Sequence, residues 1–124
     1  ISSMLDATMS GRPLRLPATG GRRIQYVYDA DVVSALYLAL NAGKLPNPAY
    51  NVSGPGSYSD EEIAAMIRAL VPETDITFER SNVKGETVVG APLDYSAAQR
   101  DFGYEPKYDM ARGLTAYVEW FRNK

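Results

Sequence analysis

The stretch "IQYVYDADVVSALYLALNAG" (residues 24–43) changes within a few residues from a strand-like pattern to a helical one. Its first five residues are β-branched, aromatic or polar in the mixture that favours a short strand. The part "VVSALYLALNAG" predicts a helix that ends at Gly43. That helix is apolar on nearly every side, and its one polar stripe consists of Ser34, Tyr37 and Asn41. We therefore expect a strand followed by a helix that is buried on most sides.

The junction between the two patterns carries two acids, Asp29 and Asp31. Two carboxylates this close together could hold a metal ion or work as an acid/base pair. Asp31 is also well placed to cap the helix, and Asp29 adds negative charge near the same positive helix end. Capping is the simpler interpretation, so we expect a structural role for Asp31 and no metal site.

Helices alternate with short strands along the rest of the chain, which predicts an α/β or α+β fold in one domain, residues 1–124. Ser59 and Glu62 form a capping box, and Asp94 is expected to cap a short helix that Gly103 ends. The further helices are expected over residues 1–11, 59–71, 95–102 and 108–124. Strands are expected within residues 12–23, 49–53 and 75–81, with a short one at Val88 and Val89.

The composition excludes several kinds of site. The net charge of -2 provides no basic surface that would attract nucleic acid. The chain contains no cysteine and no histidine, which removes thiolate nucleophiles, imidazole bases and the usual zinc ligands. No stretch has the pattern of a secretory signal or a membrane span, so we expect a cytoplasmic protein without a membrane partner. The apolar pattern already starts at Ile1 without a preceding Met, which is the pattern expected of a chain that begins within a longer protein.

Two stretches resemble catalytic signatures without completing them. "NVSGPGSYSDEE" (residues 51–62) places Gly54 and Gly56 between a strand and a helix, as a dinucleotide-binding loop does. Ser59 stands where the third glycine is needed, and the acids after it would repel a pyrophosphate, so a tight turn followed by a capped helix is favoured. A Tyr-x-x-x-Lys pair is also missing, because no lysine has a tyrosine four residues before it.

Arg22 and Arg23 are the best candidates for a ligand contact. They follow Gly20 and Gly21, and a flexible glycine pair would allow guanidinium groups to fork onto an anion. The alternative is that both are solvated loop charges.

The order of these elements resembles the C-terminal part of the extended short-chain dehydrogenase/reductase family, the group of NAD-dependent epimerases, dehydratases and sugar dehydrogenases. The resemblance covers essentially the whole chain. It is carried by "YVYDADVVSALYLAL", "YNVSG", "SDEEIAAMI", "LDYSAAQRDFGYEP" and "MARGLTAYVEWF". Its most specific positions are Asp31, Tyr50, Asn51, Asp94, Gly103, Pro106 and Gly113. The implied fold is the substrate-binding portion of a Rossmann-type protein.

The resemblance implies that cofactor binding and substrate binding lie in different parts of the protein. An N-terminal half, absent from this chain, would carry the glycine fingerprint and the Tyr-x-x-x-Lys pair, bind NAD or NADP, and transfer the hydride. This chain alone would be inactive and would bind a sugar-type substrate. The residues implied as substrate contacts are Leu5, Arg22, Arg23, Tyr26 and Lys84, and those implied as structural are Asp31, Asn51, Ser59 and Asp94.

The resemblance also implies that "YNVSG" joins the edge of the nucleotide-binding sheet and that the "DADVV" helix packs near it. The isolated chain would then expose apolar surface, so its expected partners are a second copy or its own N-terminal domain.

The substrate class is where the chain departs from the family pattern. Nucleotide-sugar members usually carry an arginine at the position of Ile24, and Arg22 lies one strand repeat earlier on the same face. At the position of a second family arginine the chain has Val83 and Lys84. A lysine ammonium is a point charge and cannot form the two parallel hydrogen bonds of a guanidinium. The departures favour a smaller or less charged substrate, such as a sugar acid or another hydroxy or keto compound. The alternative function is a non-catalytic binding or regulatory module of the same fold.

Overall fold

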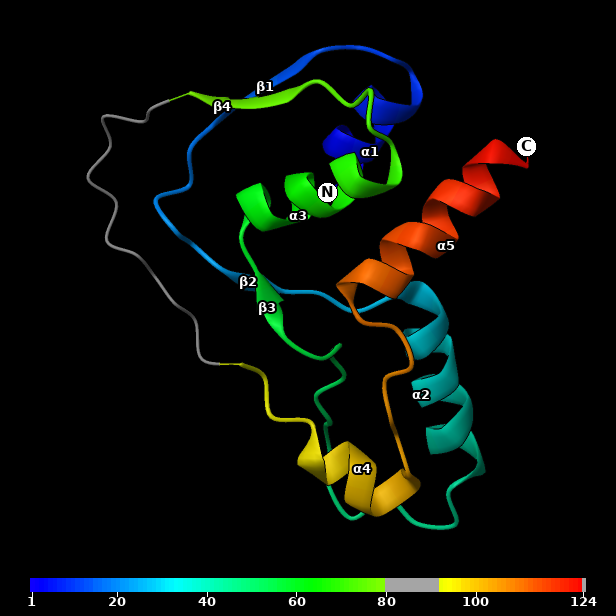
Figure 1. Cartoon of the computed structure of the whole chain (residues 1–124). Helices are drawn as coiled ribbons and strands as arrows, with labels where there is room; N and C mark the ends of the chain where they lie inside the picture. Colours follow the sequence, from blue (N-terminus) through cyan, green and yellow to red (C-terminus); the bar gives the residue numbers. More distant parts are fainter. Residues whose placement is uncertain (80–91, 124) are drawn as a thin grey trace. The chain divides into compact units, whose positions relative to one another are not determined.

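The computed structural model describes residues 1–79 and 92–123, and it confirms the alternation of helices with short strands (Figure 1). The helices are α1 (Ser2–Met9), α2 (Asp29–Asn41), α3 (Asp60–Leu70), α4 (Ser96–Phe102) and α5 (Met110–Arg122). The strands are β1 (Leu14–Pro17), β2 (Ile24–Gln25), β3 (Ser57–Tyr58) and β4 (Ile76–Glu79). Among these described residues, no helix combines the length and apolarity needed to cross a bilayer.

The chain divides into two compact units. Within the described residues, unit 1 consists of residues 1–24, 58–79 and 111–123, and unit 2 consists of residues 25–57 and 92–110. The chain passes from unit 1 to unit 2 within β2 and returns within β3, and these two strands pair with each other.

Unit 1 is organised around α3, whose start is fixed by local hydrogen bonds. The Ser59 hydroxyl accepts from the Glu62 backbone N–H and the Glu62 carboxylate accepts from the Ser59 N–H, so the predicted capping box is confirmed. Ile63 and Ile67 are 0% exposed, as expected for one apolar face of an amphipathic helix. The core of this unit further contains Met4, Leu5, Ala7, Ala64, Val71, Ile76, Leu114 and Val118.

A two-stranded parallel sheet completes unit 1. β1 pairs with β4 in a register that places Leu14 beside Ile76 and Leu16 beside Phe78. Both strands agree with the expected positions, as far as the described residues extend. The strand expected at Val88 and Val89 lies outside the described residues.

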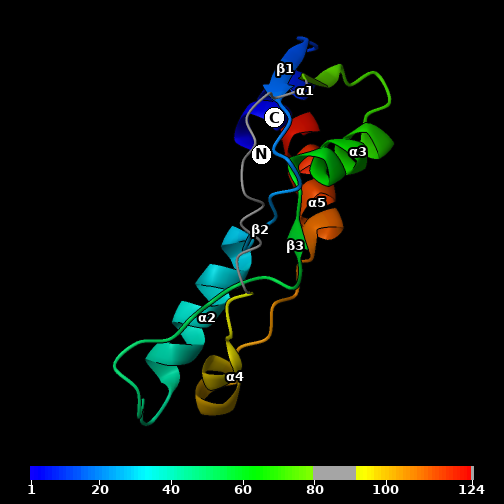
Figure 2. The same ribbon diagram turned by 90° about the vertical axis from the view of Figure 1, so that its left-hand side faces the viewer.

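Unit 2 is built on the packing of α2 against α4, which lie side by side in Figures 1 and 2. Its core is a cluster of Ala35 from α2, Ala98 from α4 and the fully buried Tyr104. The Tyr104 hydroxyl donates a hydrogen bond to the Ser53 carbonyl over 2.9 Å. Gly103, with a φ of 72°, ends α4 in the left-handed conformation, as the sequence predicted.

Helix α2 differs from its prediction at both ends and on one face. It begins at Asp29 after an N-cap at Tyr28, so Asp31 lies inside the first turn and is not the cap. It ends at Asn41, two residues before Gly43, and the predicted strand before it stops at Gln25.

The expected burial of α2 on most sides is also wrong. Its outward side chains are exposed by 64% at Val33, 61% at Leu36, 67% at Tyr37 and 86% at Leu40. The apolar pattern predicts which side chains favour burial, but it does not show that a covering element is present.

The expected strand "AYNVS" is not a strand in the structure. Residues 49–53 form no β-ladder with any other described residue. A segment becomes a strand only when a second strand pairs with it. Tyr50 and Val52 nevertheless both pack against the Tyr104 cluster, so the alternation that predicted the strand is kept.

Candidate functional site

The arginine candidates lie in a tight turn of unit 1, residues 19–23, which we name the arginine loop. Gly20 and Gly21 have φ angles of 65° and 86°, and the Arg22 N–H donates to the Thr19 carbonyl over 3.3 Å. Two positive φ angles in succession are those of a type I′ turn, which glycine adopts without steric cost. The glycine pair therefore fixes the direction of the loop.

Two acids at the start of α3 hold this loop. The Thr19 N–H and hydroxyl donate to the Glu61 carboxylate over 3.3 Å each, and the Arg23 guanidinium donates to Glu62 over 2.9 Å. Burial acts to raise the pKa of Glu61, but hydrogen bonds from its own backbone, Ser59 and Thr19 outweigh it and lower that pKa. The Arg23 hydrogen bond lowers the pKa of Glu62. Both carboxylates are thus ionised at neutral pH, and the loop is fastened to the helix.

The predicted substrate contacts are consequently not equivalent. Arg22 is exposed, whereas Arg23 is half-buried and engaged by Glu62, so an anion would have to compete for it. Leu5 is 4% exposed in the core of unit 1. Tyr26 belongs to unit 2, and Lys84 lies outside the described residues.

The two acids of the junction, Asp29 and Asp31, differ in burial and in their hydrogen bonds. Its side chain is 1% exposed, and its two carboxylate oxygens accept backbone N–H groups from Lys107 at 2.9 Å and from Tyr108 at 3.0 Å. Asp29 is exposed and accepts a local hydrogen bond from the Ala30 N–H. Asp31 therefore anchors the segment before α5 onto α2. Within residues 1–79 and 92–123, no group of three or more acids, histidines or cysteines could hold a metal ion.

The glycine loop of unit 2 is a point of close backbone approach. The Gly54 N–H donates to the Tyr26 carbonyl over 3.0 Å, and a Cβ added at Gly54 would lie 2.4 Å from that same oxygen. The Gln25 amide donates to the Gly54 carbonyl over 2.8 Å and accepts from the Leu93 N–H over 2.7 Å. Glycine is required here because backbone fills the space of a side chain, which supports a turn and not a phosphate cradle.

Tyrosines surround this part of unit 2, and those with shifted pKa values are shifted upward. Tyr28 and Tyr108 stack with ring centroids 4.3 Å apart, and burial followed by the charge of Asp29 raises the pKa of Tyr28. Burial raises the pKa of Tyr104 to about 12. Both tyrosines make packing contacts, Tyr28 by stacking on Tyr108 and Tyr104 as part of the core cluster of unit 2.

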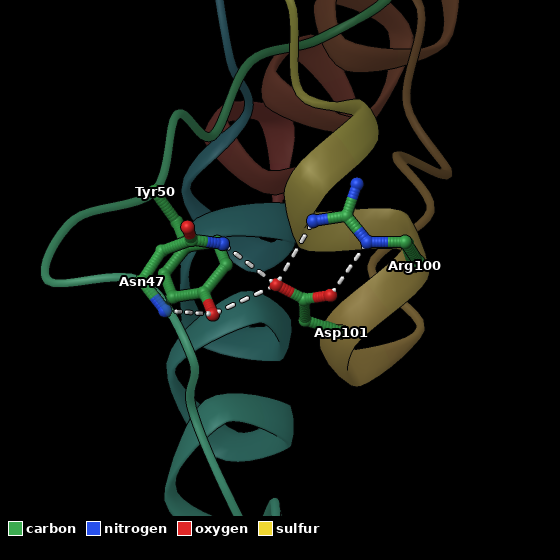
Figure 3. Close-up of polar contacts among 4 residues, drawn as sticks. All are labelled: Asn47, Tyr50, Arg100 and Asp101. Atoms are coloured by element: carbon green, nitrogen blue, oxygen red, sulfur yellow. Dashed lines mark hydrogen bonds and ion pairs between the residues drawn. The ribbon is translucent and has the colours of Figure 1, made fainter.

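Asp101 is the centre of a second polar network (Figure 3). Its carboxylate accepts from the Asn47 side-chain amide at 2.8 Å, the Tyr50 hydroxyl at 2.9 Å and the Arg100 guanidinium at 2.8 Å. The Arg100 hydrogen bond is the main cause that lowers the pKa of Asp101, with Tyr50 and Asn47 adding to it against burial. The network fastens residues 47–50 to α4.

The remaining structural predictions concern Asn51 and Asp94. The Asn51 side-chain amide donates to the Asp94 carbonyl over 2.9 Å, so Asn51 has an architectural contact as expected. The N-cap of α4 is Tyr95, one residue later than predicted. The Asp94 carboxylate still accepts the Ser96 N–H over 2.9 Å, and this bond lowers its pKa. Asp94 thus serves the helix start from just outside the cap position.

Sequence reasoning missed distant hydrogen-bond partners inside each unit. Glu61 contacts a residue 42 positions away, Asp101 one 54 positions away and Gln25 one 68 positions away. No local spacing encodes such pairs.

In the described part of the chain, each carboxylate with a shifted pKa is shifted downward, and these are Glu61, Glu62, Asp94 and Asp101. Groups of this kind bind and orient, whereas a general base works best with a pKa near the operating pH.

No family model matches the chain. A search of curated proteins finds dTDP-4-dehydro-6-deoxy-D-allose reductase from Streptomyces sp., 30% identical over 125 residues, a match that covers 98% of this chain and 36% of the reductase. Among solved structures, a partial consensus L-threonine 3-dehydrogenase matches with a TM-score of 0.80 and 24% identity, over 98% of this chain and 40% of that one. The dTDP-glucose 4,6-dehydratase of Bacillus anthracis, solved in complex with NAD, matches with a TM-score of 0.78 and 24% identity, over 98% of this chain and 38% of that one.

The chain therefore spans only 36% to 40% of the length of these proteins. The matched region is a C-terminal part in each case, and the fold is the one that part has in Rossmann-type proteins.

Proposed function

We propose that this chain, which is similar over 98% of its length to the C-terminal part of extended short-chain dehydrogenases/reductases, is the substrate-binding part of an NAD(P)-dependent enzyme that acts on a sugar, sugar acid or nucleotide sugar. The observation that carries the proposal is the 30% identity to a dTDP-sugar reductase along nearly the whole chain. The agreement in fold with a dTDP-glucose dehydratase supports it.

The chemistry of the described residues agrees with a binding role. The arginine loop offers the exposed Arg22 guanidinium to an anionic group of the substrate, while the Arg23 ion pair with Glu62 holds the loop in place. A guanidinium forks onto phosphate or carboxylate through two parallel hydrogen bonds, so either anion fits this position. We assign the anion contact to Arg22 of unit 1, and Tyr26 of unit 2 stays a predicted substrate contact.

The cofactor is assigned to the N-terminal part that the relatives possess. Gly54 would be the natural phosphate-binding glycine of this chain, but the space beside it is filled by the Tyr26 carbonyl, 2.4 Å from an added Cβ. The loop therefore does not fit the pyrophosphate of NAD or NADP. Bound by the N-terminal part, NAD or NADP would supply hydride transfer to a substrate that this chain orients.

A chimera tests the proposal. The matching C-terminal segment of the Streptomyces reductase is replaced by this chain, and turnover is measured with a dTDP-sugar, a sugar acid and L-threonine, with NAD(P)H for a substrate to be reduced and NAD(P)+ for one to be oxidised. We expect turnover of a sugar-type substrate, and none in a reductase that lacks the segment. Arg22→Ala in the chimera should raise KM at least tenfold, because it removes a charge-assisted contact.

The matched control is Arg12→Ala, another exposed arginine of unit 1, whose guanidinium pairs with Asp6. It should leave KM unchanged. A chimera that folds and binds NAD(P)H but turns over neither sugar-type substrate would contradict the proposal. Turnover of none of the three substrates would favour a non-catalytic module.

A further inference from the structure

The turn that carries Arg22 has Thr19 at its other end. The Arg22 N–H donates to the Thr19 carbonyl over 3.3 Å, and the positive φ angles of Gly20 and Gly21 set the turn between these two residues. Because this hydrogen bond closes the turn, the position of the Arg22 backbone depends on the position of Thr19.

Thr19 is itself held by a side chain of α3. The Thr19 N–H donates to Glu61 Oε1 and the Thr19 hydroxyl donates to Glu61 Oε2, each over 3.3 Å. The two residues are 42 positions apart, so this contact fixes the turn relative to α3 and is not part of the turn itself. On the other side of Arg22, Arg23 donates to Glu62. The Arg22 backbone thus lies between two attachments of the arginine loop to α3.

Glu61 should act on an anion at Arg22 in two opposite ways. Its negative charge repels the anion, whereas its hydrogen bonds hold the backbone from which the guanidinium projects. Asp60 is the neighbouring acid in the first turn of α3 and is half-buried like Glu61. Within the described residues, Glu61 binds Thr19 and Asp60 does not. A comparison of the two acids therefore separates the effect of charge from the effect of the hydrogen bonds.

We propose that Glu61 is a positioning residue for anion binding at Arg22: by holding Thr19, it strengthens the binding of a phosphate or carboxylate group even though its own charge opposes the anion. A loop that is tied to α3 loses less conformational freedom when a ligand binds than a free loop does. The anion contact of Arg22 belongs to the proposed function, and the role of Glu61 rests on it.

Titration of the 124-residue chain with inorganic pyrophosphate at constant ionic strength tests this role. NMR shifts of the backbone amides of residues 20–22 give the dissociation constant. Glu61→Ala should weaken binding by about threefold to tenfold, because the loop must then be ordered by the ligand. Glu61→Gln has the same net charge as Glu61→Ala, but its side-chain oxygen still accepts the Thr19 N–H, so it should bind pyrophosphate at least as well as the wild type.

Asp60→Ala is the matched control, since it removes the same charge from the same helical turn. It should not weaken binding. If Glu61→Ala, Glu61→Gln and Asp60→Ala all bind pyrophosphate equally well, the acids act through charge alone and the proposal is wrong. If the wild type shows no shift that Arg22→Ala abolishes, both the Arg22 contact and the role of Glu61 are overturned.

Two further variants test the route from Glu61 to Arg22. In an Arg22→Ala chain, Glu61→Ala should cause no further loss of binding, because residues that act through one another are not additive. A further loss of the same size would overturn the proposal. Thr19→Val removes the hydroxyl donor from the loop side and leaves α3 unchanged, so it should also weaken binding, by less than Glu61→Ala. Unchanged binding in Thr19→Val and Glu61→Ala together would contradict the attachment.

The chimera distinguishes failure of this role from failure of the proposed function. In an active chimera, Glu61→Ala should raise KM for the sugar-type substrate and leave kcat nearly unchanged, as expected for a lost binding contribution. A chimera without sugar turnover, combined with the expected Glu61 effect on pyrophosphate, would overturn the proposed function and leave the positioning role. An active chimera, combined with equal pyrophosphate binding by Glu61→Ala and Glu61→Gln, would overturn the positioning role and leave the proposed function.

Discussion

Replacing Asp31 by asparagine tests whether the Asp31 carboxylate anchors Lys107 and Tyr108. Both Asp31 oxygens accept backbone N–H groups, from Lys107 and Tyr108, and the side chain is 1% exposed. Asparagine has nearly the same shape but only one acceptor oxygen, and its NH₂ group would face the second donor. A hydrogen bond to a charged acceptor contributes about 1.5–3 kcal/mol, and the unsatisfied donor adds to the loss. We therefore expect a local destabilisation of about 2–4 kcal/mol.

Amide hydrogen exchange measures this change where it occurs. Since each 1.4 kcal/mol is a factor of ten, exchange at Lys107 and Tyr108 should accelerate by roughly thirtyfold to a thousandfold. Asp29→Asn is the matched control, because Asp29 is exposed in the same helical turn and should change stability by no more than about 0.5 kcal/mol. Equal, small effects of the two substitutions would refute the anchoring role of Asp31.

Three further substitutions test the other local contacts. Gly54→Ala should destabilise the chain by about 1–3 kcal/mol, because the added Cβ would lie 2.4 Å from a backbone oxygen. Gly43→Ala is the control and should be neutral, since a Cβ there would have no atom within 4 Å. Urea unfolding measures the stability of both variants. Ser59→Ala should cost about 1 kcal/mol through loss of the cap, and unchanged urea unfolding would contradict this. The pKa of Asp101 is lowered from 3.8, so its stabilisation is complete above that value and is lost as pH falls below it. An NMR pH titration of the Asn47 side-chain amide should show this loss, and Asp101→Asn should abolish it.

The sequence predicted those features that depend on neighbours within a few residues. The capping box of Ser59 and Glu62 and the left-handed Gly103 were identified because each acts inside one helical turn. For Asp31 the sequence suggested a cap, because its hydrogen-bond partners are 76 and 77 residues away and no local pattern reveals them. The exposed side of α2 was missed for a related reason, since apolar periodicity does not reveal whether a covering element exists.

The arginine loop shows how the same polar groups can serve both the fold and a binding site. Ordering a loop when a ligand arrives costs free energy, and a loop that is already ordered avoids that cost. Here the positive φ angles at Gly20 and Gly21 set the turn, and the Arg23 bond to Glu62 fixes its far end. The backbone of the exposed Arg22 therefore lies between the glycine turn and the Arg23 bond. Glu61 and Glu62 bind Thr19 and Arg23, and neither pairs with Arg22. An anion that binds there meets a guanidinium that projects from an ordered backbone, so loss of the Arg23 bond should weaken anion binding even though Arg23 need not touch the ligand.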